Sequence, residues 1–554
     1  MEFLERRAML AAGDVLANHY TAGSTGEDLN ETVLTPANVN STSFGKVFTT
    51  TLDGQVYAQI LAVANVNITR GSSQGLHNVL YAATMHNSLY AIDATTGSIL
   101  WQDNFSQIAD PRVTIIGSPM PTAGVTTFPA VSGDNSLVNG ADIGPELGIL
   151  ATPTIDSNTG ILYLVADTQE LCNGSSPIGT FISGTTDIHY VQRLWAINIA
   201  NGAVAISPTN PAVEPATGGK IVGDVILNPT GANTVPSFSS YTGYKYVAGP
   251  YVKGSGDNGD YAPGSGDVDP ADGWVTSSGD AGTPWGAVNK TPMQTGYVVF
   301  NALLQMNRVA TTLINGEIYL GFASHGDDGP YYGWLLGYNA TTLANNVAFV
   351  TVPNFEDFSV VSGDRADFIA QAGFWNAGST ITSDGTYLYI SSGNGAFNPN
   401  TSNFNATYTS ADNGHVVPMP LDDDYGDTVL KLQLDLNADQ RNINLDTGVI
   451  HNPNGTYDPD GGYNANGYGL KVVDYFTPSN VFLLNKNDED IGSGGLLLIP
   501  STGPEARTAH FDSATGTYNV QADSIGDPML VTAGKEGQIY LIHANNLGGY
   551  NTQY

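Results

Sequence analysis

The amino-acid sequence predicts an all-β protein, and three observations lead to this prediction. Charged residues make up only 13% of the 554 residues, whereas the chain contains 65 glycines, 28 tyrosines and 19 phenylalanines. Short apolar or alternating runs recur along the chain, and each ends at Gly, Asp-Gly, Asn or Thr-Thr-Gly. No long stretch carries apolar residues at helical spacing. Many short strands joined by glycine turns explain this composition better than helices do.

The first repeating unit begins at about Phe44. Its predicted segments are FGKVFTTTLDG, QVYAQILAV, NVLYAATMH, SLYAIDATTG and SILWQDNF, which form a lead-in and four consecutive antiparallel strands. Alternation of apolar and polar residues within these runs is typical of half-buried strands. We therefore expect one four-stranded antiparallel sheet in this part of the chain.

The same unit recurs four more times. Each copy has a first strand, a turn, a second strand that ends in small residues, a connection, and a third strand. The third strands end near Asp93, Asn198, Asn339, Gln433 and His543. A four-stranded unit repeated around an axis is the blade of a β-propeller. The sequence thus predicts a β-propeller of four-stranded antiparallel blades, at least five of them visible, with seven or eight expected in a complete ring.

Long loops are expected between the blades, because the copies are spaced more widely than the roughly 40–50 residues of a compact blade. We expect a leader and loosely ordered arm over residues 1–42 and the propeller over residues 43–554. The largest insertions fall at about 207–296 and 434–469, both rich in Gly, Asp and Asn. Such loops commonly carry binding specificity. Because the last copy stops after a third strand, the propeller is expected to be incomplete at its C-terminal end.

Charge and cysteine content exclude several classes of function. The net charge is −34, from 52 acidic and 18 basic residues. A nucleic-acid partner or an anionic membrane surface would repel such a chain, whereas divalent cations would not. The single cysteine, Cys172, excludes an intrachain disulfide, a Cys-x-x-Cys-His haem site and a cysteine-based zinc cluster.

We expect the protein to be exported from the cytoplasm. The sequence has no apolar run of about 18 residues that could form a transmembrane segment. Its start, LERRAML, resembles a segment at the beginning of many large bacterial surface and exported proteins. Together with the acidic, Asn/Thr/Gly-rich composition, this resemblance implies a secreted, periplasmic or cell-surface protein.

The corner between the third and fourth strands of the first unit carries a family resemblance. The stretch AIDATTGSILW places Ala91, Asp93, Gly97 and Trp101 at the spacing of the docking motif of the PQQ-type repeat. In that family the tryptophan packs between neighbouring blades. The second copy keeps Ala196, Asn198 and Gly202, with Ile206 where the tryptophan would stand. The chain therefore resembles the quinoprotein alcohol dehydrogenase-like superfamily from about Phe44 onward, many of whose members bind no quinone.

The resemblance also implies a site. In the quinoprotein alcohol dehydrogenases, pyrroloquinoline quinone (PQQ) lies on a tryptophan, beside a calcium ion held by Glu, Asn and Asp. The Asp abstracts the substrate proton, and an Arg or Lys contacts the quinone oxygens. The matching positions here are Asp328 in place of the Glu ligand, Trp375 under the quinone, Asn394 as metal ligand, Asp490 as metal ligand and catalytic base, and Lys535 at the quinone. Asp488 is the rival to Asp490.

These residues would form a coherent oxidoreductase centre. Calcium prefers oxygen ligands and would polarise a quinone carbonyl. Asp490 would act as general base on an alcohol or sugar, with hydride passing to the quinone. PQQ and calcium are thus the expected cofactors. No haem is expected, and the adjacent cysteines common in these enzymes are missing from this sequence.

Two alternatives stay open. The alternative to a dehydrogenase is a non-catalytic secreted or cell-surface propeller that binds a protein, a glycan or calcium through its acidic loops. A second calcium site is suggested by an EF-hand-like spacing of acidic residues at Asp435, Asn437, Asp439 and Asp446, without the usual glycine or flanking helices. Each candidate Asp or Asn also has an ordinary interpretation as a turn residue.

Overall fold

The computed structural model describes part of the chain. The described residues are 13–28, 31, 34–42, 44–106, 128–129, 143, 146–173, 186–207, 219–227, 244–253, 297–325, 331–353, 370–397, 407–409, 416–418, 420, 423–439, 466–500, 507–512, 517–522 and 528–550. Among them, no helix is long and apolar enough to cross a membrane.

The first two units are antiparallel sheets. The first has the order β1-β2-β3-β4. Its strands are β1 (Leu61–Ile68), β2 (Gly75–Ala83), β3 (Ser88–Asp93) and β4 (Ile99–Asn104). The second contains β7 (Thr154–Asp156), β8 (Ile161–Asn173), β9 (Thr186–Asn198) and β10 (Val204–Ile206). Two further strands extend its β9 edge, β11 (Lys220–Leu227) and β12 (Tyr244–Ala248). These two lie inside the segment that the sequence predicts as an inserted loop.

The third and fourth units share one continuous sheet. The third contains β15 (Gln305–Met306), β16 (Thr312–Ile314), β17 (Glu317–Ser324), β19 (Trp334–Asn339) and β20 (Asn345–Val350). The fourth contains β22 (Thr382–Ser383), β23 (Tyr387–Ser391), β26 (Val429–Asp439) and β27 (Gly467–Thr477). Strand β20 pairs with β27 at Ala348 and Phe349, which joins the two units.

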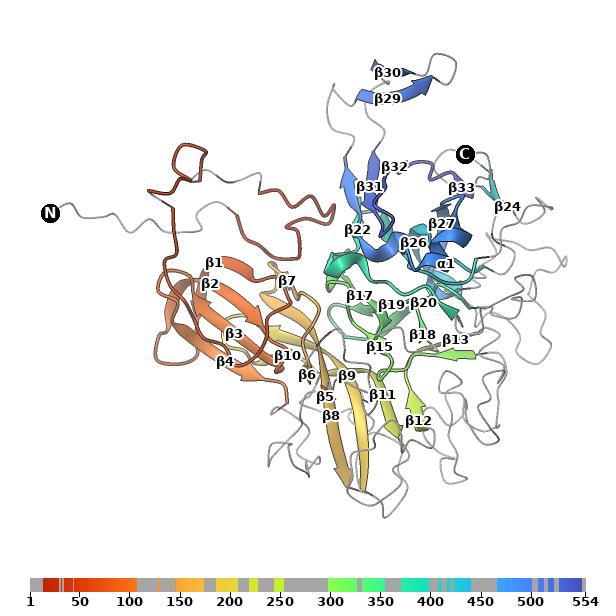
Figure 1. Ribbon diagram of the computed structural model, residues 1–554. Helices are drawn as coiled ribbons and strands as arrows, with labels where there is room; N and C mark the ends of the chain where they lie inside the picture. The colour runs from red at the N-terminus through yellow and green to blue at the C-terminus, as the bar shows by residue number, and fades with distance from the viewer. Residues whose placement is uncertain are drawn as a thin grey trace.

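The fifth unit has three strands in the described part of the chain. They are β28 (Leu497–Ile499), β31 (Met529–Ala533) and β32 (Ile539–His543). The hairpin of β29 (Arg507–Asp512) and β30 (Thr517–Ala522) projects away from the other strands, at the top of Figure 1. A short helix, α1 (Val481–Asn487), which the apolar pattern does not predict, links the fourth unit to the fifth.

Five short strand pairings in the described part of the chain lie outside the main strands of these units. They are β5 (Phe128–Pro129) with β6 (Glu146–Leu147), β13 (Tyr251–Lys253) with β14 (Tyr297–Val299), β18 (Tyr331–Tyr332) with β21 (Ala370–Gln371), β24 (Thr407–Thr409) with β25 (Val416–Pro418), and β33 (Gly549–Tyr550) with β27. Antiparallel strands thus dominate the described chain, and the all-β prediction is confirmed.

The hydrophobic cores lie between successive units, which is the packing of propeller blades. Along β8, Leu162 and Leu164 face a core shared with the first unit, whereas Tyr163 and Val165 face a core shared with the third. Strand β23 alternates likewise between cores shared with the third and fifth units. Because side chains alternate across a strand, each sheet presents one apolar face to each neighbour. Figure 1 shows the units following one another in an arc from β1–β4 to β31–β32.

The corner after β3 has the structure that its motif predicts. Asp93 Oδ1 accepts hydrogen bonds from the backbone N–H groups of Thr95 (3.0 Å) and Thr96 (2.7 Å). Gly97 has a φ of +73°, and its N–H donates to the Asp93 carbonyl at 2.8 Å. Trp101 lies opposite Ala91 and is only 4% exposed, in the core shared by the first and second units. The predicted docking of one blade on the next is thus observed at Trp101.

Residues of the predicted leader contact several units. Val15 pairs with Ala62 in β1, and Leu16 O accepts a hydrogen bond from Ile155 N in β7. Ala22 O and Gly23 O accept hydrogen bonds from Ser383 N and Leu498 N, in the fourth and fifth units. The segment therefore follows the first strands of four units and ties the two ends of the arc together.

Candidate functional site

The predicted site residues are held at one end of the blades by the strand topology. In an antiparallel unit, the start of the first strand and the end of the second lie at the same edge. Trp375 precedes β22 and Asn394 follows β23, while Asp490 precedes β28 and Lys535 follows β31. The four segments therefore converge on one edge, and the contacts below show that they meet.

Asp490 is the centre of this cluster. Its Oδ2 lies 2.6 Å from Lys535 Nζ, and its Oδ1 accepts the backbone N–H of Asn394 at 2.6 Å. The backbone N–H of Lys535 donates in turn to the Asp490 carbonyl at 3.0 Å. The Asp490 side chain is buried. Both of its carboxylate oxygens are thus oriented by residues of other segments.

Asp488 lies at the rim of the same cluster. Its Oδ1 accepts a hydrogen bond from Asn394 Nδ2 at 2.8 Å and lies 3.3 Å from Lys535 Nζ. Asp488 is the C-cap of α1, with a left-handed φ of 58°, and its side chain is 65% exposed. The structure therefore brings both candidate aspartates to Asn394 and Lys535, with Asp490 buried and Asp488 exposed.

Trp375 lies against two glycines of the same edge. A Cβ atom built on Gly393 would lie 2.9 Å from Trp375 Cδ1, and one on Gly373 would lie 3.3 Å from Nε1. The indole is partly buried against the core between the second and third units, with Tyr331 edge-on at a centroid distance of 6.5 Å. These glycines let the indole lie directly on backbone, beside the Asp490 carboxylate.

A strained turn follows Trp375. Asn376 and Ala377 both have a positive φ, 43° and 48°, and Gly378 continues with 78°. Two consecutive non-glycine residues in the left-handed region are costly, and such strain gathers at functional sites. Trp375 thus begins a turn whose conformation the surrounding structure must enforce.

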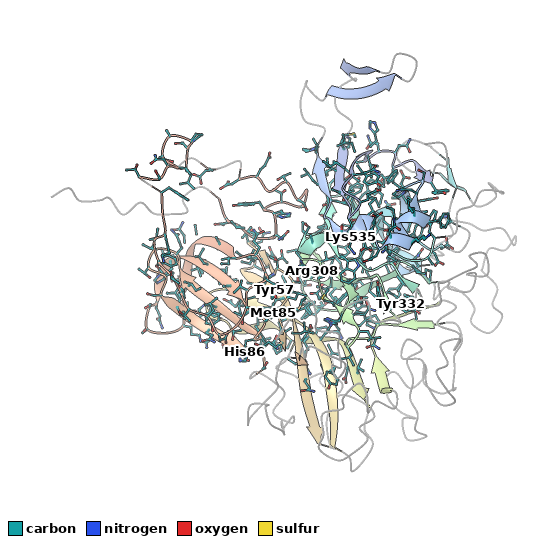
Figure 2. All side chains as sticks on the ribbon, viewed as in Figure 1. Tyr57, Met85, His86, Arg308, Tyr332 and Lys535 are labelled. Carbon is teal, nitrogen blue, oxygen red and sulfur yellow. The ribbon has the colours of Figure 1, made fainter. Side chains whose placement is uncertain are left out.

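Lys535 is electrostatically tied to the two aspartates. Partial burial alone would lower the pKa of its ammonium, but the hydrogen bond and charge of Asp490 outweigh burial, so the pKa is raised. Lys535 is therefore charged at neutral pH. Figure 2 shows Lys535 beside the blue C-terminal strands, above Arg308 in this view.

Asp427 is part of the cluster, although the sequence did not single it out. It is fully buried, its Oδ1 accepts the Ile491 N–H at 3.1 Å, and its own N–H donates to Gly393 O at 2.7 Å. Burial, and then the charge of Asp490, raises the pKa of its carboxyl well above the ordinary value. Its place in the run DDDYGD, just before a buried strand, is the one signal that could have found it.

Asn485 supports the same backbone from α1. Its amide makes two hydrogen bonds with Gly395, accepting from N at 2.8 Å and donating to O at 2.9 Å. These bonds fix the chain one residue beyond Asn394. No pattern in the sequence points to Asn485, because the apolar pattern does not predict α1.

Two other predictions have a different outcome. Asp328 lies outside the described residues. Of the EF-hand-like residues, Asp435, Asn437 and Asp439 lie in strand β26. Asp435 forms an ion pair with Lys471 at 3.3 Å. Asp446, like Asp328, lies outside the described residues. An extended strand is not the turning loop that an EF-hand-like site needs.

The oxygen donors in the cluster suit a hard cation. Asn394 Oδ1 is buried and has no hydrogen-bond partner in the described part of the chain, and neither has Asp427 Oδ2. An orphaned amide oxygen beside two carboxylates is the kind of donor set that calcium prefers. Among the described residues, however, no three His, Cys, Asp or Glu side chains are grouped closely enough to hold a metal alone.

A separate cavity lies at the same edge of the first unit. Its volume is about 300 Å³, and its lining includes Asp53, Met85 and Glu146. The Asp53 carboxylate accepts hydrogen bonds from Thr84 and Ser88, and Glu146 is 3.0 Å from His86 Nδ1. This cavity shares no residue with the cluster at Asp490, and its two acids already have partners.

Comparison with known proteins gives distant likenesses only. No family model and no curated protein matches the chain. A quinohemoprotein alcohol dehydrogenase from Pseudomonas putida is similar at 12% identity and a TM-score of 0.34, over 97% of this chain and 47% of that one. A europium-containing methanol dehydrogenase is similar at 9% identity and a TM-score of 0.34, over 97% of this chain and 57% of that one. The chain thus spans about half the length of these structures.

Proposed function

We propose that the chain is an exported quinoprotein-like β-propeller that binds PQQ and calcium at the Asp490 cluster and oxidises an alcohol or sugar. One observation carries the proposal: Asn394, Asp490 and Lys535, expected together from the family resemblance, are linked by direct contacts, and Trp375 packs on Gly393 beside them. They come from four segments at separations of up to 160 residues in the chain (535 − 375). The strand topology brings these segments to one edge, but it does not by itself pair these particular side chains.

The metal would be held by oxygen atoms of the cluster. Asn394 Oδ1 is free to accept a cation, Asp490 supplies a carboxylate beside it, and Asp328 is the expected third ligand. When bound, the quinone supplies the hydride acceptor, and calcium polarises its carbonyl group.

The protein's own residues have separate tasks in this proposal. Trp375 offers a flat apolar surface for the ring system. Asp490 takes the proton of the substrate hydroxyl, with its carboxylate oriented by the Asn394 N–H. Lys535 pairs with Asp490 and stabilises negative charge that develops nearby. Asp488, being exposed, is less suited to water-excluded proton transfer than Asp490.

A reconstitution experiment tests the proposal. The purified protein is incubated with PQQ and calcium, and reduction of an artificial electron-accepting dye is followed with a panel of alcohols and sugars. Asp490→Asn is expected to lower the rate by at least about 100-fold, as loss of a general base does. Asp384→Asn, a turn carboxylate in the same unit that accepts the N–H groups of Thr386 and Tyr387, is the matched control and is expected to keep the rate. Absence of dye reduction with every substrate would contradict the enzyme proposal.

A non-catalytic role is the second candidate, and one observation favours it. Lys535 already neutralises Asp490 at 2.6 Å, so the cluster has a charge partner without any metal. In this alternative the propeller binds a protein, a glycan or calcium through its acidic loops. Saturable calcium or partner binding without quinone binding would support it.

A further inference from the structure

Arg308 lies at the same end of the blades as the Asp490 cluster, on a different segment. It precedes β16, the short strand that begins the third unit's main meander, just as Trp375 precedes β22 of the fourth. Ala310 pairs with Thr380, so the segments that carry Arg308 and Trp375 run beside each other. In the view of Figure 2, Arg308 lies between Tyr57 and Lys535, near the middle of the molecule.

The Arg308 guanidinium is packed against the strained turn that follows Trp375. A Cβ atom on Gly378 would overlap Arg308 Nη1. Any other residue at position 378 would therefore displace the guanidinium, quite apart from the left-handed backbone that favours glycine there. Close packing therefore fixes the position of Arg308, and no ion pair with a described residue does so.

No acceptor for this guanidinium comes from the part of the chain that the structure describes. In the described residues, its side chain has neither a hydrogen bond nor an ion pair, whereas Arg70 lies 2.6 Å from Asp103 and Arg193 donates to Thr168. The chain has 52 acidic and only 18 basic residues, so carboxylates are plentiful. A cation left unpaired in such a chain calls for a functional explanation.

Burial makes this isolation costly. Arg308 is partly buried, and burial lowers the pKa of its guanidinium, with Tyr57 acting weakly in the opposite direction. Arginine nevertheless stays charged at neutral pH. A partly desolvated cation without a partner contributes less to stability than a paired one, and an anion that pairs with it offsets that cost.

We propose that Arg308 is the anion-binding residue of a ligand site at this end of the propeller, where it receives a carboxylate or phosphate group of a small molecule. Guanidinium groups bind both oxyanions through two parallel hydrogen bonds. This inference does not depend on the binding of a quinone, since any small oxyanion of suitable shape satisfies the same chemistry.

The experiment measures anion binding at constant ionic strength. Citrate serves as the carboxylate probe and inorganic pyrophosphate as the phosphate probe, and unfolding midpoint and calorimetric affinity are recorded for each. At least one probe is expected to bind the wild type and raise its midpoint. Arg308→Gln is expected to weaken that binding by about 10- to 100-fold, the usual value of a hydrogen bond to a charged group. Lys46→Gln, which removes one exposed positive charge elsewhere, is expected to bind as the wild type does.

The ligand-free proteins separate this role from a structural one. Because the Arg308 side chain has no partner among the described residues, Arg308→Gln is expected to unfold at the same temperature as the wild type or at a higher one. A lower midpoint would show that Arg308 stabilises the fold and would contradict the proposal. Failure of both probes to bind the wild type, or equal binding by Arg308→Gln, would overturn it. The probe that binds more tightly identifies the ligand as a carboxylate or a phosphate.

Discussion

The corner between β3 and β4 and the cluster around Asp490 use the same residue type in different ways. Asp93 accepts its hydrogen bonds from Thr95 and Thr96, two and three residues along the chain, and pairs with His77 on the neighbouring strand at 2.7 Å. Asp490 receives its partners from Asn394, 96 residues away, and from Lys535 in the next hairpin. A locally satisfied carboxylate shapes a turn, whereas one satisfied by distant segments marks a place where the fold assembles a site.

The largest difference between the two regions is expected in stability. Trp101→Ala removes a side chain that is 4% exposed and fills the core between two blades, so it should lower the free energy of unfolding by about 3–5 kcal/mol. Trp375→Ala removes a partly buried indole and should cost clearly less, about 1–2 kcal/mol. Chemical denaturation of both variants provides the comparison. A greater loss at Trp375 would show that it, too, is mainly a packing residue.

Gly393→Ala should damage the cluster without touching the corner. The added methyl would overlap Asp490 Oδ1 and lie 2.9 Å from Trp375 Cδ1, and such crowding typically costs about 1–3 kcal/mol. Gly45→Ala, where the methyl would meet open space, is the control and should leave stability nearly unchanged. The measurement is urea denaturation monitored by tryptophan fluorescence. Equal stability of the two variants would mean that the backbone can shift and that the close packing at Gly393 is not required.

The Asp93 corner should respond to acid. Burial alone would raise the pKa of Asp93, but hydrogen bonds from His77 and Thr96 outweigh it, so the pKa is lowered. A lowered carboxyl pKa adds stability above the unfolded value of about 4, and this stability is lost as the pH falls through the folded value. Asp93→Asn should therefore cost about 1 kcal/mol at pH 7 and flatten the loss of stability below about pH 4. If the stability of Asp93→Asn falls below about pH 4 as steeply as that of the wild type, Asp93 is not the cause of that loss.

Lys535→Gln should have the smallest effect on stability. The Lys535 side chain is 43% exposed. Asp490 is buried, but it keeps the Asn394 N–H and Gln can replace Lys535 as a donor, so the loss should be about 1 kcal/mol or less. Since the pKa of Lys535 is raised, its contribution is complete at neutral pH and is lost only when the pH rises past its ordinary value near 10.4. Thermal unfolding at pH 7 and pH 11 checks this sign. A stability difference that persists at the higher pH would point to packing rather than charge.

The local features of the fold were predictable from the sequence. The Asp-x-x-x-Gly turn at Asp93, its counterpart at Asn198 and the alternating runs of β2 and β8 depend on neighbours within a few residues, and the structure contains them. Strands β11 and β12 were not predicted, because their pairing with β9 is set by tertiary contacts. The left-handed turn after Trp375 was not predicted either, because its first two residues, Asn376 and Ala377, are not glycine.

The candidate site was predictable only in outline. Spacing along the chain placed Trp375, Asn394, Asp490 and Lys535 at equivalent strand ends, but no pattern could show that Asp490 would be buried and Asp488 exposed. Asp427 and Arg308 escaped notice because their significance lies in what surrounds them, an unpartnered carboxylate oxygen and an unpaired guanidinium. Such absences appear only when the chain is folded.

The affinity for PQQ in the presence of calcium tests the central claim most directly, namely that the edge around Asp490 is a quinone site. It is measured by calorimetric titration of the wild type and of Trp375→Ala. The account predicts saturable, calcium-dependent binding to the wild type and at least about tenfold weaker binding to the variant, since stacking on an aromatic ring contributes about 1 kcal/mol or more. No saturable binding to the wild type, or equal binding to both proteins, would contradict it.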